Sequence, residues 1–429
     1  MRYIALVLAA AGAAALVGAG SAAAAFVPVL SVSEDNPAAG AFSPLSLRVE
    51  RPDGQPYITA LTVALPPGLL ATIRDAEPCR ERAAATGRCR AGSRVGTVSV
   101  GLDDGASRVT LAGDASLTGP YRGAPFGLSV ALRAAPGGRD LGTTVVRLAI
   151  FVDPSDAHLI VVSDPFPTSA AGSPVGVRSV SMSVDRRRFM FNPTSCGEHE
   201  LRAQVSASDG SSVAAAAPLR TSGCGSLRFR PRLSLSVGGR GEMGDGGHPS
   251  LRALVTARRA EANLREVALR LPLSLALDYE NAGALCSFDA GRSGRCPRRS
   301  VIGRARVLTP ILRRPLAGHV YLVQGMRPGP GGRLVRTLPM LLVALRGQVS
   351  LNLHAATSVE RGAIVTTFEA LPDAPITRFE LELNGGRRGI LAVTLGRSLC
   401  RGRQLARVAM EGHSGARLRR AVALRTACR

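Results

Sequence analysis

The chain has 429 residues, of which 45% are apolar, with 48 Gly, 28 Pro and a formal net charge of +23. This apolar fraction excludes an intrinsically disordered protein, and the glycines lack the Gly-X-Y period of collagen. With 11 Phe, 5 Tyr and no Trp, aromatic surfaces on which bases or sugar rings could stack are scarce.

The first 25 residues have the pattern of an export signal. Arg2 precedes an apolar run from Ile4 to Ala25 that ends in three alanines. A basic start, an apolar stretch and an Ala-X-Ala end are what signal peptidase recognises. The alternative is a retained anchor, because the run is long enough to span a bilayer. We expect cleavage after Ala25 and an exported, soluble mature protein that is secreted or associated with the cell envelope.

In the rest of the chain, apolar and polar residues alternate in short stretches, which predicts β-strands. Turn-forming residues separate these stretches, for example at residues 52–54 and 209–210. In the first half, the predicted strands are 30–33, 45–49, 95–100, 107–111, 128–132, 145–152, 158–162 and 177–184. One helix is expected at residues 80–85.

The second half repeats this scheme. Its predicted strands are 264–271, 300–307, 318–323, 340–345, 347–353, 363–368 and 377–383. The counterpart of the helix, residues 287–295, is Gly-rich and is expected to be coil. Strands and turns at this density predict an all-β fold with antiparallel sandwiches.

Cysteine spacing reveals an internal duplication. Successive cysteines are 10, 107 and 28 residues apart in the first half and 10, 104 and 28 residues apart in the second. LTVALP at residues 61–66 returns as VALRLP at 267–272, and VALR at 130–133 returns at 343–346. We therefore expect two homologous units, residues 28–226 and 231–429. Each would contain either two packed immunoglobulin-like sandwiches or one enlarged sandwich.

An even number of cysteines in an exported chain predicts disulfides. The simplest pairing stays within each unit, although four cysteines allow three pairings per unit. A zinc site is the alternative, but no Cys-X-X-Cys motif is present. The expected bridges are Cys79 to Cys89, Cys196 to Cys224, Cys286 to Cys296, and Cys400 to Cys428.

Several phrases resemble a family of large exported proteins from high-GC Gram-positive bacteria. They are LPPGL (65–69), GPYRGAP (119–125), LGTTVVRLAIFVD (141–153), SDPFP (163–167), NPTSC (192–196) and TTFEALPDAP (366–375). The resemblance covers almost the whole mature chain. It implies export and a β-rich fold, but no activity is assigned to that family and no catalytic residue is transferred.

Charge is distributed unevenly between the two units. Residues 28–226 hold 19 Arg and 18 acidic residues, whereas residues 227–429 hold 34 Arg and 13 acidic residues. A surface rich in Arg attracts polyanions, so anionic envelope polymers or a membrane surface are the expected partners. The alternative is a solvated basic face without a dedicated partner. Sequence-specific nucleic-acid binding is not expected, because aromatic residues are few. The candidate contact residues are Arg387, Arg388, Arg401, Arg403, Arg417, Arg419 and Arg420.

No catalytic, metal or cofactor motif is recognised. Glu198, His199 and Glu200 form the densest polar triple, but they are expected to be an exposed turn after a disulfide. The GxGxxG at residues 239–244 is expected to be a hairpin loop, since no strand-to-helix context surrounds it.

We therefore expect an exported, non-catalytic envelope protein with a binding or structural role. The alternative is an extracellular polysaccharide hydrolase that uses a carboxylate pair which the sequence does not reveal.

Overall fold

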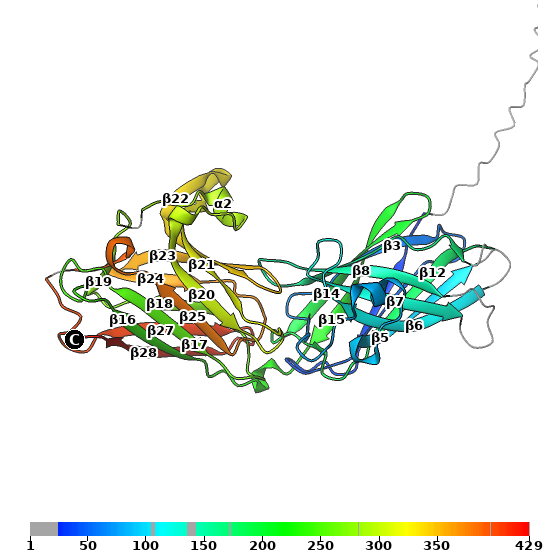
Figure 1. Cartoon of the computed structure of the whole chain (residues 1–429), viewed down its shortest axis with the longest axis horizontal. Coiled ribbons are helices and arrows are strands. Elements are labelled where there is room, and N and C mark those ends of the chain that lie inside the picture. The colour runs from blue at the N-terminus through cyan, green and yellow to red at the C-terminus, as the bar shows by residue number, and fades with distance from the viewer. Residues whose placement is uncertain are drawn as a thin grey trace, which may run out of the picture.

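The computed structural model describes residues 25–103, 108–134, 143–170, 173–281, 283–394 and 396–428. They form an all-β protein of two tandem units, each built on a sheet of eleven strands. The units lie end to end along the long axis of the molecule (Figure 1). Within these ranges, no helix has the length and apolar character needed to cross a membrane. Apart from Ala25, the predicted export signal lies outside the described residues.

The first unit contains one antiparallel sheet with the order β1-β2-β12-β5-β6-β7-β8-β9-β3-β14-β15. Two short strand pairs, β4–β13 and β10–β11, lie outside this sheet. The strands are β1 Val29–Glu34, β2 Leu45–Glu50, β3 Ile58–Ala64, β4 Leu70–Ala71, β5 Arg94–Asp103, β6 Arg108–Thr118, β7 Phe126–Ala134, β8 Thr144–Val152, β9 Leu159–Ser163, β10 Ser169–Ala170, β11 Ser173–Pro174, β12 Gly176–Val184, β13 Met190–Phe191, β14 Gly197–Ala207 and β15 Ser212–Thr221.

The second unit has the order β16-β17-β25-β20-β21-β22-β23-β24-β18-β27-β28. Here the first and last strands also pair with each other, in parallel, so the sheet closes. The strands are β16 Arg232–Gly238, β17 Ser250–Thr256, β18 Leu264–Arg270, β19 Leu275–Leu277, β20 Val301–Leu308, β21 Leu316–Pro328, β22 Leu334–Arg346, β23 Leu351–Glu360, β24 Ala363–Phe368, β25 Arg378–Leu383, β26 Leu391–Val393, β27 Leu405–Gly412 and β28 Arg417–Thr426.

The two sheets correspond strand for strand. In each sheet, a strand from late in the sequence takes the third place in the order. This strand is β12 in the first unit, between β2 and β5, and β25 in the second unit, between β17 and β20. The short pair β4–β13 corresponds to β19–β26. One difference lies at the edges: β16 and β28 share three parallel pairs, whereas the first unit has one parallel bridge beyond its edge strands, Ala38 to Ser222. The sequence repeat is therefore also a repeat of topology.

Each unit is one continuous sheet that folds over an apolar interior. In the second unit, β23 pairs with β22 through Leu351–Ala355 and then with β24 through Ala356–Glu360, so this strand passes from one layer to the other. This is one enlarged sandwich per unit, the second of the two options that the sequence left open. The alternation of side chains follows from the pleat: Leu201, Ala203 and Val205 of β14 are buried, and the residues between them are exposed.

A pair of glycines shows how closely the strands approach in both units. A Cβ atom on Gly113 of β6 would lie 1.8 Å from the backbone oxygen of Ala131 in β7. In the second unit, a Cβ atom on Gly318 of β21 would lie 1.8 Å from the backbone oxygen of Ala344. No side chain fits at either position, which explains why the phrase Leu-Ala-Gly occurs in both halves.

All four expected disulfides are present, and no free cysteine remains among the described residues. The zinc alternative is therefore wrong. The first short loop holds helix α1, Glu81–Ala85, as predicted. The second holds helix α2, Phe288–Arg292, so the expectation of coil at residues 287–295 is wrong. Ser287 explains the difference, because its side chain caps the helix by accepting a hydrogen bond from the backbone N–H of Ala290.

Most predicted strands are confirmed, with bounds shifted by a few residues. Residue 107 lies outside the described residues. Predicted strand 347–353 begins only at Leu351, because residues 347–350 form the connection after β22. Strand β3 was missed, as were the hairpin of β14 and β15 and the corresponding hairpin of β27 and β28. In β15, four consecutive alanines, residues 214–217, remove the alternation on which strand prediction depends.

A buried carboxylate joins the two units. Asp373, in the loop between β24 and β25, is 3% exposed. It accepts hydrogen bonds from the backbone N–H and Oγ1 of Thr194 (2.8 and 2.6 Å), from the backbone N–H and Oγ of Ser195 (both 3.1 Å) and from Nδ2 of Asn263 (2.8 Å). A backbone hydrogen bond also joins the units: the N–H of Ile73 donates to the carbonyl oxygen of Ile311 (3.0 Å). The NPTSC segment of the first unit (192–196) thus contacts the LPDAP segment of the second unit (371–375).

Candidate functional site

Four of the seven candidate arginines lie near one end of the second unit. Arg387 and Arg388 are in the 3-10 turn η5 (Gly386–Arg388), and Arg401 and Arg403 are in the loop before β27. Both segments contact the Gly-rich connection between β16 and β17: Gly386 N–H donates to the His248 carbonyl (2.8 Å) and Leu399 N–H to the Met243 carbonyl (2.9 Å). All four arginines are exposed and form no ion pair with a described carboxylate.

The other three candidates lie on β28. Arg417 and Arg419 oppose Glu411 and Ala409 of β27, so both lie on the outer face of this hairpin. Arg417 is paired with Glu411, with Nε 3.1 Å from Oε2, and Arg420 belongs to the opposite face although it is exposed. The structure therefore separates the seven arginines: four lie in loops near one end of the unit, two lie on the outer face of β28, and Arg420 lies on its other face.

Arginines of the first unit are more often matched by acidic residues. Arg94 contacts both Asp114 and Asp185 at 2.8 Å. Hydrogen bonds from Arg108 and Arg178 lower the pKa of Asp53. These carboxylates lie on the same sheet surface as the arginines that they neutralise, so the first unit presents a surface of mixed sign.

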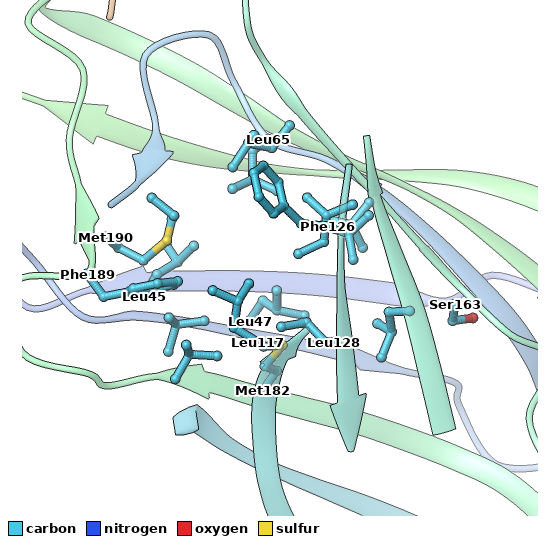
Figure 2. A pocket seen from close by; sticks show the side chains of 18 of the residues that line it. Leu45, Leu47, Leu65, Leu117, Phe126, Leu128, Ser163, Met182, Phe189 and Met190 are labelled. Carbon is cyan, nitrogen blue, oxygen red and sulfur yellow. The ribbon is translucent and has the colours of Figure 1, made fainter. Parts of the chain in front are cut away.

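An apolar cavity of about 240 Å³ occupies the interior of the first unit. No charged side chain lines it, and Figure 2 shows Leu65, Phe126 and Met182 among the apolar side chains that surround this space. Ser163 is the only side chain labelled there that carries an oxygen, and its Oγ already accepts a hydrogen bond from the backbone N–H of Leu61 (2.9 Å). Left empty, an apolar cavity of this size would cost about 6 kcal/mol.

The second unit has a smaller apolar cavity, of about 160 Å³. Tyr279 lines it, and its hydroxyl is buried without a hydrogen-bond partner. Burial raises the pKa of Tyr279 to about 12. The hydroxyl is a polar atom with unused hydrogen-bonding capacity in an otherwise apolar wall.

The two cavities meet at the joint between the units. Both are lined by Val307, Leu351, Ala374 and Ile376 of the second unit. Ala374 follows Asp373 directly, so the buried carboxylate fixes the segment that separates the two spaces. One apolar cluster therefore crosses both units, and two smaller clusters lie in the second unit.

A cluster that the sequence reasoning missed lies in the loop between β8 and β9. Asp153, Asp156 and His158 are the one group of metal-ligand side chains that lies close together in the described part of the chain. The loop itself uses these oxygens: Asp153 accepts from Ser155, and Asp156 Oδ1 lies 2.6 Å from Nδ1 of His158. Partial burial raises the pKa of Asp153, but hydrogen bonds from Ser155 outweigh it and keep that pKa below its usual value.

Two further sequence features have clear structural places. Glu198, His199 and Glu200 lie in strand β14, so the expectation of a turn is wrong; the three side chains alternate across the strand and do not converge. The GxGxxG segment forms the loop of the antiparallel hairpin β16–β17, as expected.

Comparisons with known proteins do not identify the chain. No family model matches it, and no curated protein matches its sequence. Among solved structures, it is similar to a Corynebacterium diphtheriae protein described as membrane anchored, with 9% identity, a TM-score of 0.18 and 93% and 91% of the two chains covered. It is also similar to the type II cohesin dyad of the adaptor ScaA scaffoldin of Acetivibrio cellulolyticus, with 6% identity, a TM-score of 0.18 and coverage of 93% and 97%. TM-scores this low transfer neither a fold nor a function.

Proposed function

We propose that the protein is an exported, non-catalytic binding component of the cell envelope whose second unit contacts anionic polymers through exposed arginines. Four disulfides support an oxidising location, because such bridges persist outside the reducing cytoplasm. Neither apolar cavity is lined by a carboxylate, so neither offers the acid pair that a polysaccharide hydrolase needs.

The observation that carries this proposal is the charge difference between two units of the same topology. The first unit builds its eleven-stranded sheet with 19 Arg and 18 acidic residues, and the second builds the corresponding sheet with 34 Arg and 13 acidic residues. Because the fold forms with either balance, the arginine surplus is not a requirement of the fold. A concentrated positive surface raises the local concentration of anionic polymer, and bidentate arginine–phosphate contacts then hold it.

Charge reversal tests the proposal. We expect the quadruple change of Arg387, Arg388, Arg401 and Arg403 to Glu to weaken retention on a poly(glycerol phosphate) matrix at least tenfold at low ionic strength. The salt concentration that elutes the protein should fall as well, because fewer counterions are released on binding. Reversal of Arg417, Arg419 and Arg420 tests the β28 group in the same way.

The matched control reverses four exposed arginines of the first unit. Arg80, Arg82, Arg88 and Arg90 are exposed, so the same change to Glu alters the net charge equally without touching the second unit. Retention should change much less in this control. Equal losses in both variants would show that only net charge matters, and unchanged retention in the second-unit variants would exclude an arginine contact.

A further inference from the structure

The cavity of the first unit has the properties of a binding site rather than of a packing defect. Protein interiors are packed as densely as organic crystals, with few voids larger than a water molecule. An engineered apolar cavity of about 150 Å³ already binds benzene. The cavity described here, at about 240 Å³, is larger and has no charged residue in its wall.

The lining of the cavity follows one strand of the first unit. Leu148, Ile150 and Val152 of β8 point inward and line the cavity, yet each remains partly exposed. The lining follows every inward position of this strand, from Thr144 to Val152. Eight residue steps of a strand span about 27 Å. An acyl chain that crosses half of a bilayer's hydrocarbon core is about 15 Å long, so the row of lining residues on β8 is longer than one such chain.

One end of this lining reaches the surface of the protein at Pro167. Pro167, which lies after β9 and lines the cavity, is exposed, and its neighbour Phe166 is partly exposed. At the other end, the lining continues into the second unit through Ile311 and Ile376. An apolar lining that follows one strand and reaches the surface at Pro167 suits a flexible unbranched chain better than a rigid ring system.

We propose that the first unit binds an acyl chain along β8, with the polar head of the ligand outside the cavity beside Phe166 and Pro167. This site is independent of the arginine surface and goes beyond the proposed envelope contact. The ligand chemistry is a linear hydrocarbon chain with a polar end, which either a free fatty acid or a membrane lipid could provide.

Cavity-filling variants test the site. We expect Leu148→Phe combined with Ile150→Phe to weaken binding of cis-parinaric acid, a fatty acid whose fluorescence rises in apolar surroundings, at least tenfold in delipidated full-length protein. The same variant should unfold at the same or a higher temperature than the wild type, because it fills empty space. Thr110→Phe is the control: this residue is exposed on β6, beside the lining residue Leu111, and binding should be unchanged.

Two sources of the chain are distinguished by two probes. Competition by palmitate would identify a site for free fatty acids, and co-elution with labelled phospholipid after incubation with phosphatidylglycerol vesicles would identify a site for lipid chains. Either result supports the proposal. If the wild type binds neither probe, or if the filled variant binds as well as the wild type, the proposal is wrong. If the folding of the double variant is impaired, Val161→Phe provides a second, single change in the lining.

The two proposals can fail separately. The arginine variants should bind cis-parinaric acid as the wild type does, since no arginine lines the cavity. The cavity variants should be retained on poly(glycerol phosphate) as the wild type is. A loss of both properties in one variant would point to misfolding, which the unfolding temperature detects.

Discussion

Equivalent positions in the two units carry different chemistry beneath the same small helix. In the first unit, Arg147 of β8 forms two 3.0 Å hydrogen bonds with Glu81 of α1, and Ser129 donates to the carbonyl of Ala84 (2.7 Å). In the second unit, the position of Ser129 is taken by Leu342, which is fully buried and packs near α2 with Cys286. The polar contacts beneath the helix of the first unit are thus replaced by an apolar contact in the second unit.

This comparison separates what the topology requires from what it tolerates. The strand order, the short disulfide loops and the glycine close approaches occur in both units. The charge of the surface, the contacts beneath the helix and the size of the cavity differ. The shared strand order, disulfide loops and glycines define the fold. The charge, the contacts beneath the helix and the cavity are the features by which the two units can differ in function.

The largest expected effect comes from separating the units. Asp373→Ala removes the acceptor of five hydrogen bonds and leaves buried donors of Thr194, Ser195 and Asn263 without partners. We expect a loss of about 3 to 5 kcal/mol and two unfolding transitions in calorimetry where the wild type has one. Glu369→Ala, an exposed change in the same loop, should have little effect. A single, unshifted transition in Asp373→Ala would show that the joint does not couple the units.

Next in size are the matched disulfides. Cys79 to Cys89 and Cys286 to Cys296 close loops with the same sequence separation of 10. Replacing either pair by Ser should lower the free energy of unfolding by about 2.7 kcal/mol by the chain-entropy relation. Chemical denaturation of the two double variants provides the measurement. Losses that differ by more than about twofold would break the equivalence of the two loops.

A smaller effect is expected from the ion pair between Arg147 and Glu81, which only the first unit has. A hydrogen bond from Arg147 lowers the pKa of Glu81, so this contribution to stability is present above pH 4.5 and is lost as the pH falls below that value. Because the side chain of Glu81 is 63% exposed, we expect it to be less than about 1 kcal/mol. Arg147→Met should reduce the acid dependence seen in denaturation curves between pH 5 and 3, whereas Arg82→Met, on the same helix, should leave it unchanged.

The smallest expected effect concerns the hydroxyl of Tyr279, which lines the second cavity and has no hydrogen-bond partner among the described residues. Tyr279→Phe removes a buried polar atom that has no partner, so stability near pH 7 should be unchanged or higher by less than about 1 kcal/mol. Because the pKa of Tyr279 is raised from 10 to about 12, the unfolded wild type loses this proton first, so wild-type stability should fall between pH 10 and 12 by an amount that the variant does not show. In a titration followed by tyrosinate absorbance, the variant should lack the component that ionises at the highest pH. An unchanged titration would assign that component to another tyrosine.

Sequence reasoning recovered what depends on local patterns. The cysteine intervals predicted all four bridges, and alternation located strands such as β8 and β12. It failed where local patterns are weak: the alanine run in β15 and the Gly-rich helix α2, whose Ser287 cap is one residue beyond the cysteine.

The joint and the cavity could not be predicted in the same way. Asp373 meets Thr194 across 179 residues, and no local periodicity reports such a contact. The cavity lining consists of ordinary inward-facing Leu, Val and Ile, which look the same in sequence whether the space between them is filled or empty. The arginine surplus was visible in composition, but its division between the loop end and β28 depends on the folded chain.

The closure of the second sheet has a consequence for how the protein is made. Its first strand, β16, gains its parallel partner only through Leu424–Thr426, close to the C-terminal end of the described chain. Until these three residues are in place, the outer edge of β16 keeps unpaired backbone groups, although β27 already pairs with β28 through Arg417–Ala423. A chain that ends before Leu424 would therefore leave the edge of β16 free to pair with a strand of another molecule, so the last three paired residues protect this unit against aggregation.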